Sequence, residues 1–98
     1  MIVVKINKNK IIIEGHALYD DFGKDIVCAA TSSIVTTTVN ACLRINNDCI
    51  KYKEMKDLFQ IDILKRNDII DKLLINMIDL LDELSINYPK NIKVLKEE

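Results

Sequence analysis

The chain has 98 residues, a length that predicts one domain spanning residues 1–98. Hydrophobic residues make up 49% of the sequence and charged residues 30%, as in ordinary soluble proteins. The net charge is −1 and the lysines are dispersed among acidic residues, so we expect no direct contact with nucleic acid or membrane. We also expect no apolar run long enough for a membrane span and no signal peptide, which favours a cytoplasmic location.

The apolar residues change period along the chain and predict seven elements. Two β-rich runs flank the polar turn Asn7-Lys8-Asn9, a pattern typical of a hairpin. The full prediction is strands at 1–7 and 10–16, a helix at about 25–45, strands at about 49–56 and 59–64, a helix at about 67–86 and an edge strand at 91–96. This ββαββαβ order predicts an α+β fold, in which a mostly antiparallel sheet packs with two main helices.

The predictions of the two helices depend on different sequence signals. Residues 25–45 contain many β-branched side chains, which favour strands, but about 20 residues without a turn signal favour a helix. The second helix carries an apolar stripe at helical spacing, with Asn67 or Asp68 as its N-cap and Pro89 beyond its end. We interpret that stripe as a core-facing surface rather than a ligand-binding one. The turn between the third and fourth strands is predicted to cover Met55 to Leu58.

Three cysteines, Cys28, Cys42 and Cys49, are too few and odd in number for a disulfide framework. If the segment between Cys28 and Cys42 is helical, these two lie ~21 Å apart, too far to share a zinc ion. There is no Cys-x-x-Cys pair. We therefore expect no metal and no cofactor, and we interpret Cys42 and Cys49 as packing residues.

His16 is the only histidine in the chain, and it precedes Cys28 by twelve residues. If Asp25 caps the first helix, Cys28 lies in the first turn, where unpaired N–H groups and the helix dipole favour a thiolate. His16 could then act as the base or as an imidazolium partner. The same N–H groups could bind the oxyanion that develops during acyl transfer.

Each of these residues also has an ordinary structural interpretation. Taken alone, Cys28 could be a small buried hydrophobe and His16 a satisfied histidine at a strand end. Asp25 could be a simple helix cap, a role that is compatible with catalysis. Gly15 and Gly23 could merely enable turns. The sequence does not place the two reactive side chains in contact.

The run Gly15-His16-Ala17, a short loop with Gly23, and then Asp25-Ile26-Val27-Cys28-Ala29-Ala30-x-Ser32 resembles the ribosomal-processing cysteine proteases of the Prp family. The resemblance implies an endopeptidase that removes the N-terminal extension of the twenty-seventh protein of the large ribosomal subunit. It implies a homodimer and cleavage after an aromatic residue in an apolar stretch.

Position by position, the resemblance makes Cys28 the nucleophile and His16 the general base. Asp25 and Ser32 match positions that support the site, and Gly15 and Gly23 match the motif glycines. The loop at 18–24 corresponds to a mobile segment beside the active site. Thr31 stands where the family more usually has a small aliphatic residue, a difference that could alter substrate fit.

Two other functions remain open at this stage. A non-catalytic module could use the same groove to hold the extension of the ribosomal protein without cutting it. A thiol redox sensor could use Cys28, although the chain lacks a Cys-x-x-Cys motif and a resolving cysteine near it in sequence.

Overall fold

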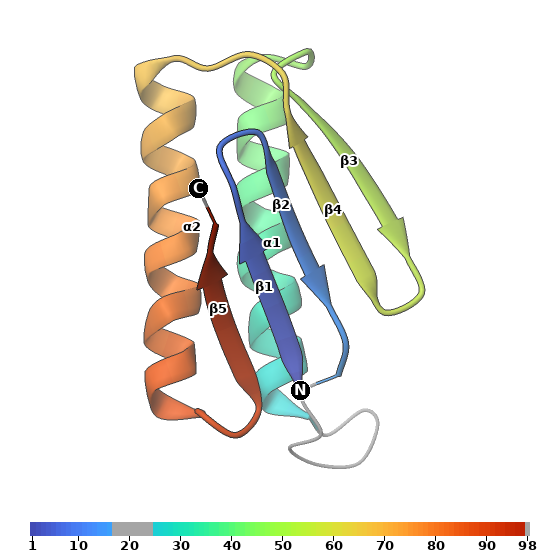
Figure 1. The fold of residues 1–98 in the computed structure, drawn as a ribbon. Helices are drawn as coiled ribbons and strands as arrows, with labels where there is room; N and C mark the ends of the chain where they lie inside the picture. Colours follow the sequence, from blue (N-terminus) through green and yellow to red (C-terminus); the bar gives the residue numbers. More distant parts are fainter. Residues whose placement is uncertain (17–24, 98) are drawn as a thin grey trace.

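The computed structural model describes residues 1–16 and 25–97. The predicted loop at 18–24, and Gly23 within it, lie outside the described residues. The elements follow the predicted order: β1 (Ile2–Ile6), β2 (Lys10–Glu14), α1 (Ile26–Ile45), β3 (Ile50–Met55), β4 (Leu58–Ile63), α2 (Asp68–Asn87) and β5 (Ile92–Lys96). The predicted ββαββαβ order and α+β class are therefore confirmed (Figure 1).

All five strands belong to one sheet, in the spatial order β3-β4-β2-β1-β5. Three neighbouring pairs are antiparallel, and only β1 and β5 run parallel. The sheet is thus mostly antiparallel, as predicted, and β5 is an edge strand. Its parallel pairing places the last strand beside the first, so both ends of the described chain are held in the sheet.

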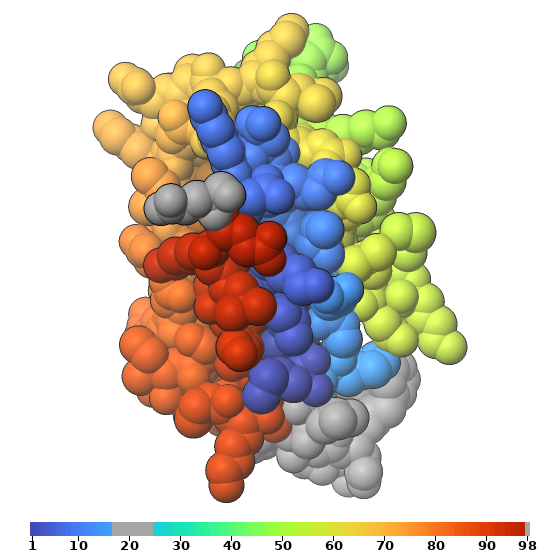
Figure 2. Space-filling view, viewed as in Figure 1, coloured from blue at the N-terminus to red at the C-terminus, as the bar shows by residue number. Residues whose placement is uncertain are grey.

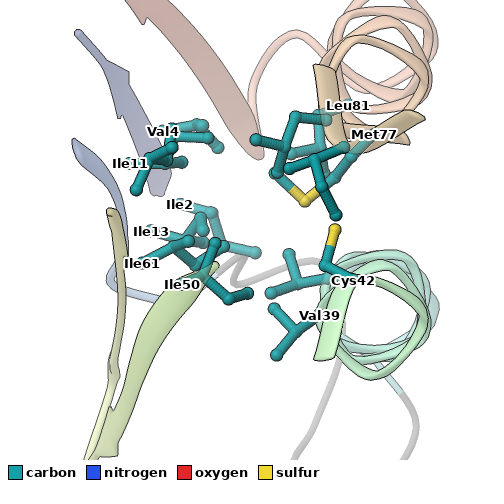
Figure 3. Packing of buried hydrophobic residues seen from close by; sticks show 14 of the residues in the cluster. Ile2, Val4, Ile11, Ile13, Val39, Cys42, Ile50, Ile61, Met77 and Leu81 are labelled. Carbon is teal, nitrogen blue, oxygen red and sulfur yellow. The ribbon is translucent and has the colours of Figure 1, made fainter. Parts of the chain in front are cut away.

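Both helices pack on the same face of the sheet and against each other (Figures 1 and 3). Alternate positions of each strand point toward them, which is why apolar residues recur at every second position over most of each strand. The fully buried side chains of the core are Val4, Ile11 and Ile61 from the sheet, Val27, Val35, Val39 and Cys42 from α1, Ile70, Met77 and Leu81 from α2, and Cys49 and Ile92. The stripe predicted on the second helix is therefore a core face.

α1 corrects one expectation from the sequence. Residues Ile26–Ile45 are long and apolar enough, by length and composition, to cross a membrane. In this fold the helix instead packs six residues into the domain core, two of which are threonines. The hydroxyls of Thr31 and Thr38 donate to the carbonyls of Val27 and Ile34, at 2.8 and 2.9 Å. These local hydrogen bonds allow two polar side chains to lie on the buried face.

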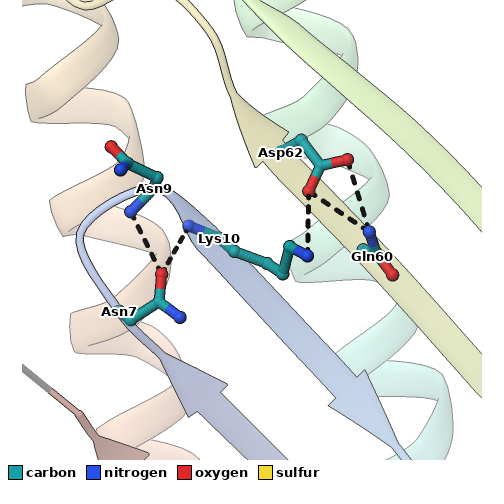
Figure 4. A network of polar contacts seen from close by, with 5 residues as sticks. All are labelled: Asn7, Asn9, Lys10, Gln60 and Asp62. Atoms are coloured by element: carbon teal, nitrogen blue, oxygen red, sulfur yellow. Dashed lines mark hydrogen bonds and ion pairs between the residues drawn. The ribbon is translucent and has the colours of Figure 1, made fainter.

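The opposite face of the sheet carries polar side chains, and Figure 2 shows β5, β1 and β2 side by side across it. Lys5 pairs with Glu14 across β1 and β2 at 2.9 Å. Lys10 lies 3.9 Å from Asp62 on β4, and Asp62 also accepts from the Gln60 amide (Figure 4). Apart from Asp62, the charged groups of these pairs are exposed to solvent, so each pair contributes little to stability.

Candidate active site

Three separate segments of the chain meet at one end of the domain: the end of β2, the start of α1 and the hairpin between β3 and β4 (Figure 1). Together they line a cavity of about 350 Å³. His16, Cys28 and Ser32 all line it, as does Gly15. The fold therefore brings the predicted thiol and imidazole to the same cavity.

Asp25 is the N-cap of α1, as predicted, because its backbone is extended and its side chain accepts from the helix. Its Oδ1 accepts from the N–H groups of Val27 and Cys28, each at 3.0 Å. Those two donors are therefore engaged, and the expectation that they are unpaired and ready for an oxyanion is wrong. An oxyanion at this turn has to compete with the carboxylate of Asp25 for the same N–H groups.

The three cysteines differ in environment. Cys28 is partly buried and lines the cavity, while Cys42 and Cys49 are fully buried in the core. Burial raises the pKa of the Cys42 and Cys49 thiols above the ordinary value of 9.0, because it penalises their charged forms. The interpretation of these two as packing residues is confirmed, and Cys28 is the thiol that faces a cavity.

His16 has a partner that the sequence did not predict. Its Nε2 lies 2.7 Å from Oδ1 of Asp57, a residue of the turn between β3 and β4. That turn is shorter than expected, because Met55 and Leu58 already pair within the sheet and only Lys56 and Asp57 form the loop. Asp57 has a φ of 61°, a left-handed conformation that aspartate tolerates better than most residues.

The backbone at Gly15 determines the position from which the His16 side chain extends. Gly15 has a φ of +94°, and a Cβ on it would lie 2.4 Å from the carbonyl oxygen of Met1. Gly15 also donates its N–H to the carbonyl of Asp57 at 3.0 Å. Glycine is thus required here both by conformation and by the close approach of another strand. This goes beyond the simple turn function considered from the sequence.

The rest of the cavity wall is largely apolar. Ile2 and Ile13 come from the sheet, and Met55, Leu58 and Phe59 come from the hairpin region. Phe59 stacks on Tyr52, with ring centroids 6.1 Å apart. Such a wall suits an extended apolar or aromatic segment better than a charged one.

Ser32 and Thr31, one turn after Cys28, also line the cavity. Thr31 is almost fully buried and its hydroxyl donates to the Val27 carbonyl, so it does not offer a free hydroxyl to the cavity. Of the predicted site residues, Gly15, His16, Cys28 and Ser32 meet in the cavity, and Asp25 acts through the cap beneath it. Within 1–16 and 25–97, no group of three His, Cys, Asp or Glu side chains is arranged to hold a metal.

A small α+β domain with a thiol and an imidazole in one cavity points to a class: the small cysteine peptidases. The family model described as cysteine protease Prp matches residues 1–93, and the chain belongs to that family. The ribosomal processing cysteine protease Prp of Staphylococcus aureus is 30% identical, with 96% of this chain and 97% of the relative covered.

Two solved Staphylococcus aureus structures share the fold. One, an essential ribosomal processing protease Prp with a covalently linked product peptide, superposes with a TM-score of 0.91 at 26% identity, covering 99% of this chain and 100% of that one. The other, with a substrate peptide, superposes with a TM-score of 0.81 at 23% identity, covering 98% and 97%. The class and the family agree, and this chain is a cysteine-type peptidase.

Proposed function

We propose that this chain removes the N-terminal extension of the twenty-seventh protein of the large ribosomal subunit, with Cys28 as nucleophile and His16 as general base. The observation that carries the proposal is that both side chains line one cavity, formed by separate segments of the chain. The Staphylococcus aureus relatives, named as ribosomal processing proteases and solved with peptides, support the substrate class.

In the proposed reaction the Cys28 thiolate attacks the carbonyl carbon of the scissile peptide bond and forms a C–S bond. The C–N bond then breaks, and the His16 imidazolium gives its proton to the departing amine. Water next attacks the thioester while His16 accepts one of its protons. This step breaks the C–S bond, releases the acid product and leaves the Cys28 thiolate beside the His16 imidazolium, the pair that began the cycle.

The apolar wall supplies the proposed specificity. An aromatic side chain before the cut would pack against Met55, Leu58 and Phe59, each of which lines the cavity. Burying one such side chain contributes about 1.5–3 kcal/mol. The site thus favours an extended apolar segment, the kind of sequence that the family resemblance implies for the extension.

The experiment is cleavage of the precursor protein, followed by mass spectrometry of both products. We expect the wild-type chain to cut once, and Cys28→Ala and His16→Ala to lose the cut while their circular dichroism stays native. Cys42→Ala is the matched control, because it removes a cysteine from the same helix but away from the cavity. Cleavage at the wild-type rate by either site variant would overturn the dyad.

The same experiment separates the alternative functions. A peptide-binding module would retain the precursor on the protein without cutting it, and would do so equally well in Cys28→Ala. A thiol sensor would show selective sulfenylation of Cys28 by peroxide without any peptidase activity. Either result would overturn the proposed function.

We also propose that the chain acts in the cytoplasm as a homodimer, as the resemblance implies. Exposed apolar side chains on α2, namely Ile69, Ile75, Leu80 and Ile86, support a partner on the outer side of that helix. Light scattering after size exclusion should give twice the mass of 11.3 kDa. A monomer mass at assay concentration would contradict the dimer, and a membrane-bound fraction after cell lysis would contradict the location.

A further inference from the structure

We propose that Asp57 is the positioning residue of His16, so that the site works as a Cys28–His16–Asp57 triad; this rests on the proposed function. Three features of the described structure carry the inference: a short side-chain contact, a backbone hydrogen bond next to it and a shared cavity.

The contact between the His16 and Asp57 side chains is short. Nε2 of His16 donates to Oδ1 of Asp57 at 2.7 Å, and both residues line the cavity that Cys28 lines. A proton held on Nε2 leaves Nδ1 as the basic nitrogen of the neutral ring. A base whose other nitrogen is held by a third group is the arrangement that thiol and serine hydrolases share.

The backbone places the two residues together independently of their side chains. The β2–β4 ladder pairs Glu14 with Leu58, and the next hydrogen bond along it joins the N–H of Gly15 to the carbonyl of Asp57 at 3.0 Å. His16 therefore leaves the sheet directly beside the hairpin that carries Asp57. The left-handed φ of 61° at Asp57 is maintained in a two-residue loop, where glycine or asparagine would be the usual residue.

The contact between His16 and Asp57 is too exposed for folding stability to be its main function. The side chain of His16 is 53% exposed and that of Asp57 is 39% exposed, and such pairs contribute little to folding. Among the described residues, Cys28 and Glu54 are the other titratable groups that line this cavity. The short contact from Nε2 to Oδ1 of Asp57 is the interaction that we propose fixes the ring.

Two substitutions separate the carboxylate from the backbone. Asp57→Gly removes the side chain and suits the positive φ, so the hairpin and its bond to Gly15 are preserved. Asp57→Asn retains an acceptor oxygen and tolerates the same conformation, but it loses the charge. The matched control is Asp71→Asn, because Asp71 is equally exposed at 39% and pairs with Arg66 at 2.8 Å on α2.

We expect kcat for precursor cleavage to fall about 10- to 100-fold in Asp57→Gly with KM changed less than about threefold, because orientation and not binding is lost. Asp57→Asn should recover part of that loss, and Asp71→Asn should match the wild type. A purely structural function would instead lower the melting temperature and leave kcat per folded molecule unchanged.

A spectroscopic measurement tests the geometry without substrate. Since His16 is the only histidine, its ring nitrogens give one unambiguous set of signals in a long-range nitrogen–proton spectrum. We expect the neutral ring to carry its proton on Nε2, and this preference to weaken in Asp57→Gly.

A proton on Nδ1, or full kcat in Asp57→Gly, would overturn the positioning function of Asp57. These results can be told apart from a failure of the proposed function. If Cys28→Ala and His16→Ala also keep full activity, the dyad itself is wrong. If only Asp57→Gly keeps full activity, the dyad stands and only the positioning residue is refuted.

Discussion

Gly15→Ala is the substitution whose cost can be worked most directly from the structure. At a φ of +94° an L-residue is strained, which costs about 1–2 kcal/mol in the left-handed region alone. The new Cβ would also lie 2.4 Å from the Met1 carbonyl oxygen, below the 3.0 Å that real Cβ contacts reach, so one strand must move by 3.0 − 2.4 = 0.6 Å. Met1 precedes the β1 ladder, which allows part of this shift to be absorbed.

We therefore expect a total loss of about 2 kcal/mol or more in the free energy of unfolding. In a domain of this size that corresponds to a melting temperature lower by about 8–16 °C. The variant should still fold, because domains of this kind have about 5–15 kcal/mol to lose. We also expect the cleavage rate per folded molecule to fall, since the displaced end of the strand leads into His16.

The assays are urea unfolding for the free energy and thermal unfolding for the melting temperature, both followed by circular dichroism. Ser33→Ala is the control, because Ser33 lies on the exposed side of α1. A melting temperature for Gly15→Ala within ~2 °C of the wild type would refute the reasoning, since about 2 kcal/mol cannot be hidden in so small a shift.

Three further predictions concern the cap, the thiols and the core. Asp25→Ala should lower the free energy of unfolding in urea by about 1 kcal/mol, and Asp25→Asn by much less, because asparagine also caps helices. Equal losses in the two variants would show that Asp25 does not stabilise the helix as a cap. The free energy of unfolding should fall as the pH rises above 9, because burial raises the folded-state pKa of Cys42 and Cys49 and the unfolded thiols ionise first. A free energy that stays flat or rises above pH 9 would contradict the burial of these two thiols. Met77→Ala, at a fully buried position, should cost about 2–5 kcal/mol in chemical unfolding, whereas Asn76→Ala, at an exposed position of the same helix, should cost about 0.5 kcal/mol or less. Similar losses would mean that α2 is packed the other way round.

The elements were predictable because their signals are local. Each signal depends on residues that are close in sequence: the period of the apolar residues, the helix cap at Asp25 and the helix end near Pro89. The sequence indicated that His16 and Cys28 form a reactive pair, because these residue types are rare in the chain and match the family motif. That they reach one cavity depends on the folded sheet.

Asp57 could not be found from local signals. It lies 41 positions after His16, and the two meet only because β2 pairs with β4 in one particular register. The engaged N–H groups at the start of α1, by contrast, follow from the cap itself. An N-cap aspartate accepts from the second and third helical residues, which here are Val27 and Cys28, so a cap and two open oxyanion donors exclude each other.

The two-residue loop of Lys56 and Asp57 restricts how this sequence can change over evolution. Adding or removing one residue there would shift the register at the tip or rotate the carboxylate away from the imidazole, whatever residue were inserted. Point mutations elsewhere in the hairpin carry no such penalty. The length of this loop, rather than its composition, is therefore the quantity to compare among homologues, and relatives with a longer loop would need a different orienting group for their histidine.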